Sequence, residues 1–219
     1  YSDSYTGAAY IFIEDETGDN AIIVSPGAAS NINDDDIIAN KELIQGSRVF
    51  MTQLEQSLDA ADTALSFAKE GGAITILNPA PAQPLGENIL KLCDFVTPNE
   101  IEAEQITGIP VKSINDAEIA AGKLLEKGAK AAVITLGEQG ALFKDKNQVI
   151  HQPSYEVGPV VETTGAGDAF NGGLAVALAE EMPIDKALRF ACATASISVT
   201  RQGTAPSMPD RHEIEALLK

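Results

Sequence analysis

A glycine-rich turn followed by an acidic residue is the segment whose residue types most directly suggest chemistry. Residues 162–173 read Glu-Thr-Thr-Gly-Ala-Gly-Asp-Ala-Phe-Asn-Gly-Gly and lead into an apolar, helix-like stretch. The backbone N–H groups of Gly165, Ala166 and Gly167 can converge on an anion at the start of that helix. Asp168 would lie beside this anion, where a carboxylate is useful if it accepts a proton from an attacking hydroxyl group. The pattern therefore indicates phosphoryl transfer to an alcohol; the alternative is that Asp168 interacts only with the helix dipole.

Composition narrows the possible partners. The 219 residues include 15 Lys and Arg against 32 Asp and Glu, a net charge of −17, which argues against nucleic-acid or anionic-membrane binding. A few backbone amides and a metal can still hold the phosphates of a nucleotide locally. However, neither a GxxxxGK[ST] nor a GxGxxG motif is present, which disfavours two common nucleotide-binding folds.

The same composition bears on the cellular compartment. Cys93 and Cys192 lie in apolar segments, so a disulfide scaffold is not expected and a reducing cytoplasm is favoured. No apolar run approaches eighteen residues, and the amino terminus lacks the order of a signal peptide. Because the chain begins with Tyr1 and not Met, we expect that this is not its native start. We expect a cytoplasmic protein.

From residue 48 onward, short apolar runs alternate with helical patterns. This alternation predicts βαβ units, and hence an α/β fold with a mostly parallel sheet covered by helices. The expected strands are 48–52, 73–78, 93–96 and 131–136, followed by a hairpin of 140–144 and 148–150. The expected helices are 57–70, 85–92, 99–107, 116–127, 166–181, 184–200 and 210–218.

The first thirty residues have a different character. Residues 7–13 and 21–24 predict two strands around the acidic loop 14–19, and no basic residue precedes Lys41. Tyr10 and Phe12 fall on one face of the first strand, and Ala9, Ile11 and Ile13 fall on the other. A hairpin that is apolar on both faces needs covering on each side. We therefore expect residues 1–30 to form part of a small β lid and residues 31–219 to form the α/β nucleotide-binding and catalytic domain.

Five segments, taken together and in order, resemble the ribokinases of the PfkB-type carbohydrate kinase family. The glycine-rich segment is the strongest marker of the wider family, and the first and last segments together point toward ribokinases. The resemblance extends over essentially the whole chain. The segments are Asn-Pro-Ala-Pro-Ala at 78–82, Thr-Pro-Asn-Glu-Ile-Glu at 97–102, Thr-Leu-Gly-Glu-Gln-Gly at 135–140, the turn and helix start at 163–173, and Val-Thr-Arg-Gln-Gly-Thr-Ala-Pro-Ser at 199–207.

The resemblance implies a fold and a reaction. The fold is a ribokinase-like three-layer α/β/α sandwich with a mostly parallel sheet and a remnant of a small β lid. The reaction is transfer of a phosphoryl group from MgATP to the 5-hydroxyl of D-ribose, with Asp168 as the catalytic base and Gly165, Ala166 and Gly167 as the anion hole. The alternatives are another PfkB-type sugar kinase, and a fragment that binds ATP without turnover.

The resemblance also implies binding residues. Glu55 and Asp168 would bind the sugar, and Asn99 and Glu102 would organise Mg²⁺. The nucleotide would be bound by Asn99, Thr135, Leu136, Gly137, Glu138, Gln139, Gly140, Gly167, Asp168 and Cys192. Three of these predictions have a plainer interpretation. Glu55 would be a solvated acid in a loop, Asn99 and Glu102 would form a helix capping box, and residues 135–140 would form a simple turn. Cys192 occupies a position where relatives often carry Asn or His, and a thiol is a poor hydrogen-bonding substitute.

A potassium site and a dimer complete the implied features. The K⁺ ligands, largely backbone carbonyls, would come from Glu162, Thr164, Ser198, Arg201, Gly203 and Ser207. The family usually carries Asp at the first of these positions, and the longer side chain of Glu162 weakens the expected response to K⁺. Relatives often dimerise through the β lid, so we expect a homodimer or larger assembly with residues 7–24 in the contact.

One part of the family pattern has no match in the sequence. The first strands of the sheet, most of the lid and a Gly-Gly-Lys-Gly-Ala-Asn element that grips the sugar are not found. A deliberately shortened chain, one fragment of a split chain and an incompletely recorded sequence would each account for this, and the sequence does not choose between them. We expect slow turnover or none from these 219 residues.

Overall fold

The computed structural model describes residues 3–13 and 20–219, so the acidic loop predicted at 14–19 lies outside the described residues. The described residues divide into two compact units. The first unit contains residues 3–7, 26–136 and 142–151. The second contains residues 8–13, 20–25, 137–141 and 152–219. The proposed boundary near residue 30 stays a prediction.

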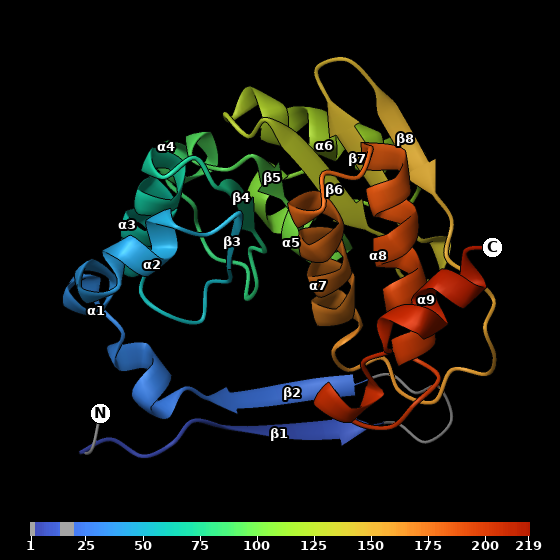
Figure 1. The fold of residues 1–219 in the computed structure, drawn as a ribbon, viewed down its shortest axis with the longest axis horizontal. Coiled ribbons are helices and arrows are strands. Elements are labelled where there is room, and N and C mark those ends of the chain that lie inside the picture. The colour runs from blue at the N-terminus through green and yellow to red at the C-terminus, as the bar shows by residue number, and fades with distance from the viewer. Residues whose placement is uncertain (1–2, 14–19) are drawn as a thin grey trace. The chain divides into compact units, whose positions relative to one another are not determined.

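A six-stranded sheet organises the first unit (Figure 1). Strands β3 to β6 pair in parallel, with Met51 opposite Ile76 and Phe95 opposite Ala131. Strands β7 and β8 follow at one edge, joined by a tight turn at 146–148. The sheet order is β3 (Val49–Thr52), β4 (Ile74–Leu77), β5 (Phe95–Val96), β6 (Ala131–Thr135), β7 (Ala141–Asp145) and β8 (Val149–Gln152). The predicted mostly parallel sheet with a terminal hairpin is confirmed.

Most of the helices lie where the apolar periodicity predicted them. In the first unit they are α1 (Asp34–Ala39), α2 (Lys41–Gln45), α3 (Leu58–Glu70), α4 (Glu87–Lys91), α5 (Glu100–Thr107) and α6 (Ile114–Glu126). In the second they are α7 (Ala166–Ala179), α8 (Ile184–Ser198) and α9 (Arg211–Leu217). Three 3₁₀ turns span Gly27–Asn31, Gly137–Gln139 and Ala205–Ser207. Helix α4 is shorter than the helix predicted at 85–92. It begins at Glu87, because Pro84 and Gly86 disfavour helix in the residues before it.

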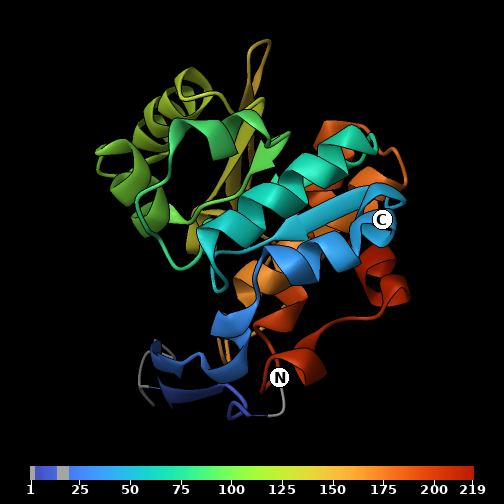
Figure 2. The same ribbon diagram turned by 90° about the vertical axis from the view of Figure 1, so that its left-hand side faces the viewer.

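Small and branched apolar residues form the core of the first unit. Ala120 and Leu124 of α6 pack against Ile134 of β6, and helix α3 lies against β3 and β4 (Figure 2). Val133 and Ile134 are consecutive and both 0% exposed, so β6 is buried on both faces. This is the pattern of a central parallel strand, in which the hydrophobic run is continuous.

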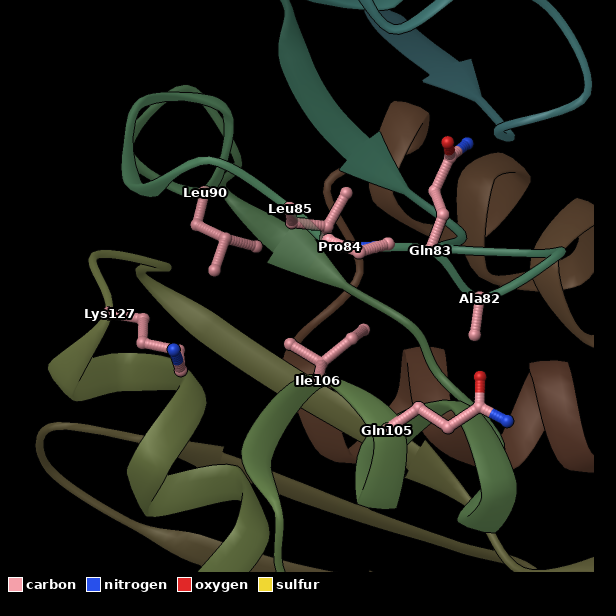
Figure 3. Close-up of a pocket in the computed structure, with 8 residues that line it drawn as sticks. All are labelled: Ala82, Gln83, Pro84, Leu85, Leu90, Gln105, Ile106 and Lys127. Atoms are coloured by element: carbon pink, nitrogen blue, oxygen red, sulfur yellow. The ribbon is translucent and has the colours of Figure 1, made fainter.

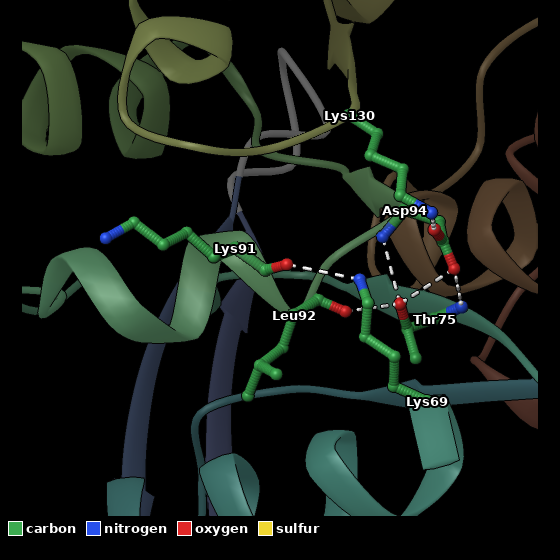
Figure 4. Close-up of polar contacts among 6 residues, drawn as sticks. All are labelled: Lys69, Thr75, Lys91, Leu92, Asp94 and Lys130. Carbon is green, nitrogen blue, oxygen red and sulfur yellow. Dashed lines mark hydrogen bonds and ion pairs between the residues drawn. The ribbon is translucent and has the colours of Figure 1, made fainter. Parts of the chain in front are cut away.

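A polar cluster joins the amino ends of three neighbouring strands (Figure 4). Thr75 of β4 is fully buried, and its N–H and hydroxyl groups both lie 3.0 Å from Asp94 Oδ2. Asp94 also forms an ion pair with Lys130, just before β6. Burial alone would raise the pKa of Asp94, but the hydrogen bonds from Lys130 and Thr75 hold it below its usual value.

The second unit contains a helix pair and the amino-terminal hairpin. Gly173 of α7 meets α8 closely: a Cβ at this position would lie 2.7 Å from Thr194 Oγ1. Strands β1 (Ala8–Ile13) and β2 (Asn20–Ser25) pair antiparallel. Tyr10 is 64% exposed and Phe12 60% exposed. The predicted hairpin is therefore present, and it shows large apolar side chains at its surface. No helix in the described part of the chain is long and apolar enough to cross a membrane.

Candidate active site

The carboxyl ends of the parallel strands carry the polar side chains of the first unit. Asn99 follows β5 and forms a parallel bridge with Thr135, the last residue of β6. The Thr135 N–H donates to the Pro98 carbonyl at 3.0 Å. Ligands of open α/β sheets bind at this edge. The structure thus brings the predicted residues Asn99 and Thr135 together, with Leu136 next along the chain.

Two amide side chains tie neighbouring strand ends at this edge. Gln53 Nε2 donates to Asn78 Oδ1 at 3.0 Å, and Asn78 Nδ2 donates to the Thr97 carbonyl at 2.8 Å. Asn78 is buried, so its amide oxygen and its amide nitrogen each need a hydrogen-bond partner, and these two bonds supply them. Neither amide was predicted to have a role. The available signal was an asparagine placed directly after a buried strand.

Glu55, the predicted sugar ligand, is exposed in the loop that follows β3. Its neighbour Leu54 is buried and fixes this loop through both of its backbone groups. The Leu54 N–H donates to the Ala80 carbonyl at 2.8 Å, and Gln83 Nε2 donates to the Leu54 carbonyl at 3.2 Å. The loop after β3 is therefore attached to the loop after β4.

Asn99 and Glu102 form the capping box that was one of their two interpretations. The Asn99 N–H donates to Glu102 Oε2 at 2.9 Å, and the Glu102 N–H donates to Asn99 Oδ1 at 2.8 Å. Burial raises the pKa of Glu102, although its bond from Asn99 opposes this effect. The described residues contain no cluster of three or more acidic, His or Cys side chains that could hold a metal.

In the second unit, the predicted nucleotide loop packs closely against a neighbouring segment. Gly137 and Gly140 have positive φ angles of 53° and 90°. A Cβ at Gly140 would lie 2.1 Å from the Gln152 carbonyl oxygen, so only glycine fits. The Cys192 thiol lies 3.8 Å from the same oxygen, and burial raises its pKa to about 12. Cys192 is thus a protonated, buried thiol beside the loop and not a nucleophile.

The turn before α7 leads directly into the helix, and the Ala166 N–H, one of the three predicted anion-binding groups, donates to the Thr163 carbonyl at 3.1 Å. Gly165 is the helix N-cap in the left-handed conformation, with φ 81°, and Asp168 lies exposed in the first turn. A Cβ at Gly167 would meet no heavy atom within 4 Å, so the space beside this turn is open. Asn171, which the sequence analysis did not single out, is buried and donates from Nδ2 to the Gly167 carbonyl at 3.0 Å. This bond fixes the first turn of the helix from its buried side.

The segments predicted to hold K⁺ also meet in the second unit. The Val161 and Glu162 N–H groups donate to the Val199 carbonyl at 2.8 and 3.2 Å. Glu162 is 8% exposed, and its Oε2 accepts from the Gly203 N–H at 2.8 Å. Among the described residues, Glu162 has no ion-pair partner.

Other residues of these segments are satisfied locally, with one exception. The Ser198 and Ser207 hydroxyls donate to the carbonyls of Ala195 and Thr204, and the Arg201 guanidinium pairs with Glu213. The Arg201 side chain could therefore not serve a cation, whereas the two serine hydroxyls use only their protons in these bonds and keep oxygen lone pairs. Thr164 Oγ1 is, within the described part of the chain, the one buried side-chain polar atom without a hydrogen-bond partner. A buried atom in this state points to a missing ligand or water.

The fold is α/β with a mostly parallel sheet, and a glycine-rich turn followed by a carboxylate is the pattern that predicted a phosphotransferase. The family model for pfkB family carbohydrate kinases matches residues 2–211, and the chain belongs to that family. It is a sugar kinase of the ribokinase-like fold, as the resemblance implied.

Three relatives illustrate the match. The ribokinase of Haemophilus influenzae is 38% identical over 214 residues, which cover 97% of this chain and 69% of the relative. The deoxyribokinase of Salmonella typhi is 35% identical, with the same coverage of both chains. The solved structure of Arabidopsis thaliana ribokinase, complexed with ribose and ATP, superposes with a TM-score of 0.88 at 31% identity and covers 99% of this chain and 70% of that one.

Proposed function

We propose that the protein to which this chain belongs transfers the γ-phosphoryl group of ATP to the 5-hydroxyl of D-ribose, giving D-ribose 5-phosphate. The observation that carries the proposal is the turn at residues 163–168, with a left-handed Gly165, open space beside Gly167 and an exposed Asp168 in the first helical turn. The ribose and ATP bound to the Arabidopsis relative support both substrates.

Each part of the site has a task in this reaction. Asp168 accepts the proton of the attacking hydroxyl. The N–H groups of Gly165 and Gly167 stabilise negative charge on the transferring phosphate, and the Ala166 N–H would join them on leaving the Thr163 carbonyl. Asn99 and Glu102 would hold Mg²⁺ through its waters, and the ion would supply neutralisation of phosphate charge. The glycines of the loop 137–140 allow the nucleotide to approach the backbone closely. Glu55 accepts hydrogen bonds from sugar hydroxyls.

Two alternative functions, phosphorylation of another sugar and ATP binding without turnover, are tested by one kinetic assay. The Salmonella deoxyribokinase is nearly as similar as the ribokinases, so 2-deoxyribose is the second candidate substrate. A coupled ADP-release assay with ribose, 2-deoxyribose and fructose separates these sugars by kcat/KM. The chain spans 69% of the Haemophilus relative. The same assay tests whether the 219 residues bind ATP with slow turnover or none. ATP binding without turnover of any sugar, in the longer protein as well, would favour the non-catalytic alternative.

The predicted cation site can be tested through the carboxylate of Glu162. A buried carboxylate with one N–H partner and no ion pair is stabilised by a monovalent cation beside it. We expect replacement of K⁺ by Na⁺ to lower activity or nucleotide affinity, and Glu162→Asp to increase the response to K⁺. Titration in K⁺, Na⁺ and tetramethylammonium at constant ionic strength measures this response. Equal behaviour in all three salts would rule out a functional site.

The exposed apolar side chains of the hairpin support a homodimer formed through it. We expect the double variant Tyr10→Asp and Phe12→Asp to shift a dimer to monomer in sedimentation velocity, because charges oppose burial of that face. Leu43→Asp is the matched control, since this residue is also exposed and lies on α2, outside the hairpin. A monomeric wild-type chain at micromolar concentration would refute the proposal.

A further inference from the structure

The face of the first unit near α4 contains a pocket to which no role has been given (Figure 3). The connection from β4 to β5 contains only the five-residue helix α4, whereas α3 and α6 each have 13 residues. The helical layer is therefore thinner here, and a cavity of about 420 Å³ remains. It is lined by Ala82, Gln83, Pro84, Leu85, Leu90, Gln105, Ile106 and Lys127.

The lining is apolar along its length and polar at its ends. Figure 3 shows Leu85, Pro84 and Ile106 in the middle of the pocket, with Lys127 toward one end and Gln105 toward the other. Lys127 is half-buried, and its ammonium group makes no hydrogen bond or ion pair with any residue that the structure describes. A half-buried cation with no partner among the described residues favours a bound anion locally, although the chain as a whole carries a net charge of −17.

We propose that this pocket binds a small organic monoanion, a carboxylate with an apolar body. The carboxylate would accept from Lys127, and the apolar body would lie against Leu85, Leu90 and Ile106. The single cation matches one negative charge better than two, which favours a carboxylate over a phosphate monoester. The volume suits a compact ligand, since small-molecule sites begin at roughly 300 Å³.

The pocket is connected to the loop that carries Glu55. Gln83 lines the pocket, and its Nε2 donates to the Leu54 carbonyl; the Leu54 N–H donates to Ala80, in the same loop as Gln83. A ligand that fixes residues 82–85 would therefore also fix Leu54 and its neighbour Glu55. The consequence for sugar affinity rests on the proposed function, whereas binding to the pocket does not.

The binding test uses 4-phenylbutyrate and its neutral amide as probes, with ligand-observed NMR on the 219-residue chain. We expect a dissociation constant of about 10⁻³ M or lower for the acid, and binding at least about tenfold weaker for the amide. Lys127→Met, which keeps the length of the side chain and removes its charge, should weaken binding of the acid by about tenfold. Lys123→Met is the matched control: Lys123 lies in the last turn of α6, which Lys127 caps, pairs with Glu126 at the surface and does not line the pocket.

Three results would overturn the binding proposal: no binding of the acid, equal binding of acid and amide, or equal loss in the Lys127 and Lys123 variants. The connection to the loop is tested by hydrogen exchange of the Leu54 amide, which should slow several-fold when the probe is bound. Unchanged exchange at saturation would refute the connection. Neither readout requires kinase activity, so failure here is distinguishable from failure of the proposed reaction.

Discussion

Replacing Asp168 by Asn is expected to lower kcat by about 10²–10⁴-fold while nucleotide affinity stays near normal. The amide is almost the same size as the carboxylate but cannot accept the proton of the attacking hydroxyl. The measurement is steady-state ribose phosphorylation, together with ATP binding by calorimetry. It requires a form of the protein that includes the amino-terminal portion of its relatives, in which activity can be measured.

The plainer interpretation of Asp168 makes a different prediction. If its carboxylate only interacts with the helix dipole, its removal costs about 0.3–1 kcal/mol of stability and leaves catalysis nearly intact. Asp185 provides the matched control, because it is also an exposed carboxylate in the first turn of a helix, α8. Asp185→Asn should change stability by a similar small amount and leave kcat unchanged. A loss of less than tenfold for Asp168→Asn would favour the dipole interpretation.

Replacing Asp94 by Ala is expected to lower the free energy of unfolding by about 1–3 kcal/mol. The substitution removes the acceptor of the Thr75 N–H group, which is buried at the start of β4. Urea denaturation at pH 7 measures the loss. Glu126→Ala is the control, since its pair with Lys123 lies at the surface, and it should cost less than about 1 kcal/mol. Equal effects of the two substitutions would contradict a structural role for the buried cluster.

The Asp94 carboxyl also predicts a pH dependence. Because its pKa is lowered in the folded state, its ionisation stabilises the fold above the usual pKa near 3.8, and this contribution is lost as the pH falls through the folded value. The stability difference between wild type and Asp94→Asn should therefore be largest near neutral pH and shrink below pH of about 4. A difference that grows on acidification would have the wrong sign for this mechanism.

Local patterns in the sequence were sufficient for the order of the elements. Continuous apolar runs indicated strands buried on both faces, and β6 has this burial at Val133 and Ile134. The starts of α5 and α7 could be predicted because the residues that mark each start lie within one helical turn of each other in the sequence. These residues are Asn99 with Glu102, and Gly165 with Asp168. The acidic residues 34–36, preceded by Asn33, are typical of a helix N-terminus, and α1 begins there with Asn33 as its N-cap. Helix α2, which has only five residues, was missed.

Contacts between distant residues were decided only by the tertiary structure. Gln53 and Asn78 are 25 residues apart, and Glu162 and Gly203 are 41 apart; each pair meets because two loops lie at the same place in the fold. The pocket near α4 likewise needs Gln83, Gln105 and Lys127 from three separate segments. The sequence by itself determined the family, the parallel sheet and the place of the glycine-rich turn before α7, because these depend on periodicity and on short motifs. Packing between distant segments decides which polar groups are paired and which remain available to a ligand. No local pattern in a single sequence encodes that packing.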